Sequence, residues 1–169
     1  VYTVNVKGSA AVRELDYQEL LETALTEYGL KDPRDSSAID NANVVSDIQF
    51  PTTRQLNTIA YRDYEKEFDG KYTPVVITSS DPDVIEAPTT PNSARVWVYR
   101  PLPDESAKTV TLTMKILDRP NGPQTGEDAS GLPVLAEKSV TVSVRPLTQA
   151  EIDAEIALMA KVKAAYWDG

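Results

Sequence analysis

Residues 109–117 read Thr-Val-Thr-Leu-Thr-Met-Lys-Ile-Leu, and this stretch decides the class of fold that we expect. Polar and apolar residues alternate along it, as they do in a β-strand with one face toward a core and the other toward solvent. The β-branched threonines of the polar face also favour a strand. The apolar face carries Val110, Leu112, Met114 and Ile116.

Shorter stretches on both sides of this strand show the same alternation or a short β-branched run. Loops rich in Pro, Gly, Asn, Asp and Ser separate them, a composition typical of turns. The strands predicted in this way are residues 2–6, 44–50, 74–78, 84–86, 94–99 and 134–144. About seven short antiparallel strands, each with one apolar face, predict a mainly β fold of the β-sandwich type.

Two segments with helical spacing flank these strands. Residues 17–28 follow an acidic N-cap, Asp16, and stop at Gly29, so they predict a helix in the N-terminal region. Residues 148–167 begin at Thr148, the first residue of a capping box, and predict a C-terminal helix.

The composition excludes several classes of function. The chain has 169 residues, a formal net charge of -9, no His and no Cys. Without these side chains there is no imidazole base, no thiolate nucleophile and no disulfide. An acidic chain is also a poor neutraliser of phosphates, so nucleic acid is not an expected partner. No stretch reaches the roughly 18–20 apolar residues of a membrane span, and we expect no membrane insertion.

The two ends of the chain resemble each other when they are offset by 138 positions. Residues 3–28 and 141–166 share five identical residues, and both segments read as strand, short link and helix. In the helices, Leu20, Leu21, Ala24 and Tyr28 correspond to Leu158, Met159, Val162 and Tyr166. Periods of this size suit a string of domains better than a solenoid.

This repeat suggests a division of the chain. Residues 1–8 would be the closing strand of a preceding module or the first strand of this one. Residues 9–147 would form a sandwich with a leading helix, and residues 148–169 would be a C-terminal helix that begins a next module. The alternatives are one domain with two similar strand–helix units, or chance.

Residues 76–85 read Val-Ile-Thr-Ser-Ser-Asp-Pro-Asp-Val-Ile, which resembles a signature of bacterial immunoglobulin-like domains. Residues 109–113 look like the next core strand of that family, and residues 138–144 look like its closing strand. The leading helix followed by residues 44–51 is similar to the "atrophied" bacterial Ig-like subgroup. The insert at residues 52–70 departs from the family pattern.

The resemblance implies an Ig-like β-sandwich of about seven antiparallel strands with flanking helices. Domains of that subgroup occur in tandem on secreted and cell-surface proteins and carry no catalytic residues to transfer. It therefore implies an extracellular or cell-surface location, with neighbouring domains of the same polypeptide as partners. The function expected on this basis is that of a non-catalytic structural spacer.

The alternative is a carbohydrate-binding or adhesive module that takes a glycan or a host or cell-wall ligand. Arg95, Trp97 and Tyr99 share one face of a predicted strand, and flat aromatic rings can stack on sugar rings. The same rings could instead pack in the core. Residues 52–70, which fit a helix or a strand hairpin about equally well, add Tyr61 and Tyr64 as candidate contacts.

Acidic loops are the remaining candidates for a site, because carboxylate oxygens are ligands for calcium. None of them has the spacing of an EF-hand loop, so solvated acidic loops are the competing interpretation and we expect no cofactor. The residues concerned are Asp32, Asp35, Asp40, Asp118, Glu127 and Asp128.

Overall fold

A computed structural model describes residues 13–123 and 129–167 of the chain. Its elements in chain order are α1 (Tyr17–Glu27), β1 (Ile48–Gln49), α2 (Thr53–Tyr64), β2 (Val75–Ser79), β3 (Ile85–Glu86), β4 (Arg95–Val98), β5 (Lys108–Leu117), β6 (Val134–Val144) and α3 (Gln149–Tyr166). The strand predicted at residues 2–6 lies outside the described residues.

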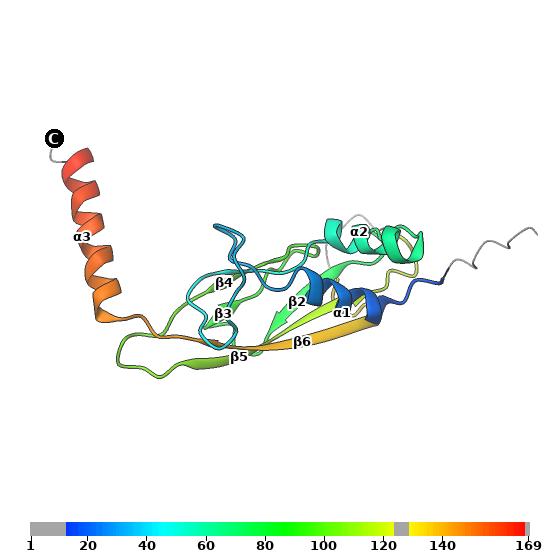
Figure 1. The fold of residues 1–169 in the computed structure, drawn as a ribbon, viewed down its shortest axis with the longest axis horizontal. Coiled ribbons are helices and arrows are strands. Elements are labelled where there is room, and N and C mark those ends of the chain that lie inside the picture. The colour runs from blue at the N-terminus through cyan, green and yellow to red at the C-terminus, as the bar shows by residue number, and fades with distance from the viewer. Residues whose placement is uncertain (1–12, 124–128, 168–169) are drawn as a thin grey trace, which may run out of the picture.

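The prediction of a mainly β, Ig-like sandwich of about seven strands is wrong. The described residues form an α/β fold with three helices and two three-stranded antiparallel sheets, in the orders β1-β4-β3 and β2-β5-β6. β1 and β3 have only two paired residues each. The larger sheet is therefore covered partly by α1, α2 and loops, where a sandwich would have a second full sheet (Figure 1).

β5 confirms the strand that the alternation predicts at residues 109–117. Its apolar side chains, Val110, Leu112, Met114 and Ile116, are 0% exposed. On the opposite face, the hydroxyls of Thr113 and Ser139 lie 2.8 Å apart across the β5–β6 pair. One face of the larger sheet thus lies in the core, while the other carries a polar ladder.

α1 covers this core and one edge of β6. Asp16 caps the helix by accepting a hydrogen bond from the Glu19 backbone N–H at 3.0 Å, and Gly29, with φ +63°, follows its end. The Gln18 side chain donates to the Glu137 carbonyl at 3.1 Å and accepts from the Glu137 N–H at 3.2 Å. These bonds satisfy backbone groups of β6 that would otherwise lie at an open sheet edge. The buried face of α1 carries Leu20, Leu21 and Ala24.

Within residues 52–70, which fitted a helix or a hairpin, α2 makes residues 53–64 a helix that ends at Glu65 with φ 54°, and residues 65–70 lie outside it. A reciprocal capping box between Thr52 and Gln55 begins it. Leu56, Ile59 and Ala60 are each 0% exposed, so the helical spacing decides the conformation. Ile59 would also match the alternation of a strand hairpin, but in the structure it lies on the buried face of α2 with Leu56 and Ala60.

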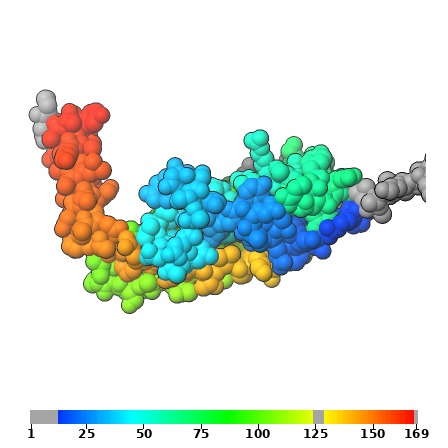
Figure 2. All heavy atoms as spheres, viewed as in Figure 1, coloured from blue at the N-terminus to red at the C-terminus, as the bar shows by residue number. Residues whose placement is uncertain are grey.

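α3 stands apart from the rest of the molecule. It projects away from the body formed by residues 13–147, and only its first turn lies near that body (Figures 1 and 2). From Asp153 to Tyr166 every side chain is exposed. The helix is therefore stabilised by its caps and its own hydrogen bonds, without packing on the body.

Candidate functional site

The outer face of β4, continued by Tyr99 directly after the strand, carries three predicted site residues. Arg95, Trp97 and Tyr99 alternate with Val96, which is 0% exposed, so their side chains point away from the core. Trp97 is 38% exposed and Tyr99 is 53% exposed. The interpretation in which these rings pack in the core is therefore wrong, because none of the helices in the described part of the chain covers this face of the smaller sheet (Figure 1).

Hydrogen bonds hold two of these side chains in place. The Tyr99 hydroxyl donates to Glu86 Oε2 at 2.6 Å, and this bond raises the pKa of Tyr99. Arg95 Nη2 donates to Asp47 Oδ2 at 2.8 Å. The second oxygen of Asp47 accepts the backbone N–H of Val98 at 2.9 Å, which ties the ion pair to the strand itself. The face thus combines exposed rings with ordered polar groups.

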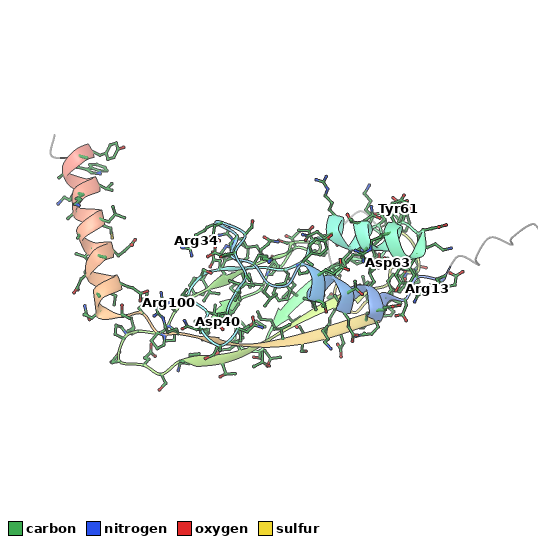
Figure 3. All side chains as sticks on the ribbon, viewed as in Figure 1. Arg13, Arg34, Asp40, Tyr61, Asp63 and Arg100 are labelled. Atoms are coloured by element: carbon green, nitrogen blue, oxygen red, sulfur yellow. The ribbon has the colours of Figure 1, made fainter. Side chains whose placement is uncertain are left out.

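The two tyrosines of α2 do not form one site. Tyr64 is only 2% exposed, so the prediction that it contacts a ligand is wrong. Its hydroxyl donates to Glu19 Oε2 at 2.6 Å, and burial together with this bond raises the pKa of Tyr64 to about 12. The Arg13 guanidinium lies 4.8 Å from the ring centroid. Tyr61 is 55% exposed and lies toward the end of the body that is far from α3 (Figure 3).

The acidic loop residues are engaged in local hydrogen bonds. Asp32 pairs with Arg34 at 2.6 Å, and the hydrogen bonds from Arg34 hold the pKa of Asp32 well below its usual range. Asp35 accepts the Ser37 N–H, and Asp40 accepts the Ala42 N–H at 3.0 Å. Within residues 13–123 and 129–167, no group of three or more possible metal ligands comes together.

Of the other residues considered for calcium, Asp118 donates its N–H to the Pro133 carbonyl at 2.9 Å. Glu127 and Asp128 lie outside the described residues.

A groove of about 510 Å³ lies between the loop after α1 and the start of α2. Its charged lining residues are Lys31, Asp32 and Arg54. Asp32 is already paired with Arg34, and the cap of α2 at Thr52 is already satisfied by Gln55. The groove therefore offers mixed charge without a nucleophile–base pair among the residues that line it.

The base of α3 holds a cluster that the sequence did not reveal. Glu151 accepts hydrogen bonds from Arg100 at 2.9 Å, from Arg145 at 2.8 Å and from the Thr148 backbone N–H at 2.7 Å. Arg100 also donates to the carbonyl of Pro146 at 2.8 Å. The sequence predicted only the capping box of Thr148 and Glu151, because Arg100 is 51 residues from Glu151 in the chain.

Hydrogen bonds to Arg100, and then to the Thr148 backbone, lower the pKa of Glu151 to about 2. The Arg100 side chain is only 12% exposed, so its charge needs the acceptors that Glu151, Pro146 and the Arg145 carbonyl supply. We call Arg100, Arg145, Thr148 and Glu151 the α3 anchor. It fixes the first turn of α3 to the body (Figure 3).

Beyond this anchor, α3 exposes more large apolar and aromatic side chains than any other helix or strand among the described residues. Six of them are 48–82% exposed: Ile156, Leu158, Met159, Val162, Tyr166 and Trp167. Exposed apolar surface of this extent marks an interaction surface. No helix among the described residues is long and apolar enough to cross a membrane.

Comparisons of the chain with protein families, with curated proteins and with solved structures found no match.

Proposed function

We propose that this chain is a non-catalytic structural module of a secreted or cell-surface multidomain protein. In this role residues 13–147 act as a spacer, and α3 sets the direction of the neighbouring domain in the same polypeptide. One observation carries the proposal: α3 is fixed at its base by the anchor, while every side chain from Asp153 to Tyr166 is exposed. The absence of His and Cys from the sequence agrees with a role without catalysis.

The link between β6 and α3 supports a stiff joint. The Arg145 N–H donates to the Val44 carbonyl at 3.0 Å, and the Leu147 N–H donates to the Pro101 carbonyl at 2.8 Å. The link is therefore tied to the body on both sides of Pro146. A short, hydrogen-bonded link has little freedom to act as a hinge, in contrast to a flexible linker.

A pair of spin labels tests the stiffness of this joint. Because the chain has no Cys, labels on Lys108→Cys and Lys161→Cys report a single distance, from the exposed start of β5 to α3. The spacer predicts a narrow distance distribution that Glu151→Ala broadens. Glu155→Ala, which removes a carboxylate one turn further along, is the control and should leave the distribution narrow. If the labelled chain without any further substitution gave a broad distance distribution, the proposed spacer function would be refuted.

A carbohydrate-binding module is the second candidate, and the exposure of Trp97 and Tyr99 favours it. Stacking on a sugar ring needs an accessible aromatic face, and Arg95 and Glu86 could bond to the hydroxyls. On a glycan array, this function predicts binding that Trp97→Ala abolishes. Tyr72→Ala, which removes a 51% exposed ring outside the β4 face, should keep the binding. No binding of any glycan by the unaltered chain would refute it.

A further inference from the structure

The same helical positions have opposite environments in α1 and α3. In α1, the side chains of Leu20, Leu21 and Ala24 are each 0% exposed. The offset of 138 residues places them opposite three residues of α3 that are exposed: Leu158 at 56%, Met159 at 64% and Val162 at 48%. At these three positions the repeat therefore keeps apolar residues that α1 buries and α3 leaves exposed.

The C-terminal ends of the two helices support the correspondence. Glu27, the last residue of α1, falls at position 165 under the offset, next to Tyr166, the last residue of α3. Tyr17, the first residue of α1, falls at position 155, whereas α3 already begins at Gln149. α3 thus consists of an added first part that carries the anchor and a second part, residues 155–166, that repeats α1.

The interface of α1 shows what covers such a face. α1 packs against β6 and against α2, and its three buried residues belong to the one core cluster of the body. The body cannot cover α3 in the same way, because the anchor directs that helix outward (Figure 2). The corresponding strand and helix must then come from elsewhere in the polypeptide.

We propose that α3 is the leading helix of a following module of the same fold in the same polypeptide. A strand equivalent to β6 and a helix equivalent to α2 in that module cover Leu158, Met159 and Val162. This inference rests on the proposed spacer function and names its partner. β6, the short link and α3 then form a continuous joint, in which one strand closes a module and the next helix opens another.

One difference between the helices refines the partner. In α1, Gln18 donates a hydrogen bond to the backbone carbonyl of Glu137 in β6. Glu22 forms an ion pair with Lys138 of β6, with 3.5 Å between the carboxylate oxygen and the ammonium nitrogen. The counterparts of Gln18 and Glu22 in α3 are Ile156 and Ala160. The following module therefore presents an apolar surface where this body presents the polar edge of β6.

Hydrogen exchange of α3 tests the inference. The 169-residue chain is compared with the same chain extended by the polypeptide that follows Gly169 in its natural protein. We expect the amides of residues 155–166 to exchange at least about tenfold more slowly in the longer chain, because they then open only with the second module. Leu158→Asp should remove this protection, and Leu158→Met, which keeps the apolar volume, should retain it.

Ala164→Asp is the matched control, since its counterpart Thr26 is exposed on α1. It should leave the protection in place. The inference is overturned if no polypeptide follows Gly169, if exchange in α3 is the same in both chains, or if Leu158→Asp keeps the protection. The spin-label experiment tests the stiffness of the joint and does not depend on these exchange results. The two experiments therefore distinguish a wrong spacer function from a wrong partner for α3.

Discussion

At the scale of single residues, Glu151 shows how one side chain serves two purposes. It completes the capping box of α3 with Thr148, and it also forms ion pairs with both Arg100 and Arg145. Charge-assisted bonds of this kind have specific geometry, so they fix a direction as well as an attachment. The residue at which α3 leaves the body is thus also the residue that orients it.

The lowered pKa of Glu151 makes the anchor sensitive to acid. A folded-state pKa of about 2, below the ordinary value of 4.5, means that the anchored state binds fewer protons than the released state. The contribution of the anchor is therefore fully present above pH 4.5 and is lost as the pH falls through about 2. We expect the distance between labels on Lys108→Cys and Lys161→Cys to broaden over this range. The measurement is made where far-ultraviolet circular dichroism shows the body still folded.

Glu151→Gln is the control for this titration, because an amide has no proton to gain. Its distance distribution should be broader than that of the parent at pH 7 and should not change further toward low pH. A parent distribution that stays narrow down to pH 2, with the body folded, would contradict the assigned role of Glu151.

At the scale of elements, the local signals predicted most of the secondary structure. The alternating stretches appear as β2, β4, β5 and β6, and both helices with N-cap signals appear as α1 and α3 within one or two residues of their predicted ends. β1 is shorter than predicted, since residues 44–50 contain only two paired strand residues. α2 could not be assigned, because Ile59 and Tyr61 matched a strand period while Leu56 and Ala60 matched a helical one.

The capping box of α2 has a measurable effect on stability. Thr52→Ala removes the side-chain acceptor of the Gln55 N–H, which lies 3.3 Å from it. We expect the free energy of unfolding in urea to fall by about 1 kcal/mol. Thr58→Ala removes an exposed hydroxyl from the same helix and should change it by less than about 0.5 kcal/mol. Equal losses in the two variants would show that the cap contributes nothing specific.

At the scale of the whole molecule, the chain divides into a body with one core and a helix with none. The core cluster draws on both sheets, α1 and α2, and includes no residue of α3. Figure 2 shows α3 leaving the body at one end. An arrangement of this kind suits the proposed role, in which the helix sets the direction of a neighbouring domain.

Truncation tests this division of the molecule. Ending the chain at Ile152, the last half-buried residue of α3, removes only residues whose described side chains are exposed. We expect the free energy of unfolding of the body, measured in urea by circular dichroism, to change by less than about 0.5 kcal/mol. A loss of several kcal/mol would mean that α3 packs on the body in solution and that the division at the anchor is wrong.

The sequence was enough to predict the strands of the larger sheet, the ends of α1 and α3, and the apolar face of β5. These features depend on residues close together in the chain, whose spacing and capping can be read directly. What covers each of these faces became clear from the three-dimensional structure. α1 and α2 take a place where we expected strands, the rings of Trp97 and Tyr99 are left open, and Arg100 meets Glu151 across 51 residues. Such contacts join distant segments, and an apolar face specifies that it must be covered without specifying by which element.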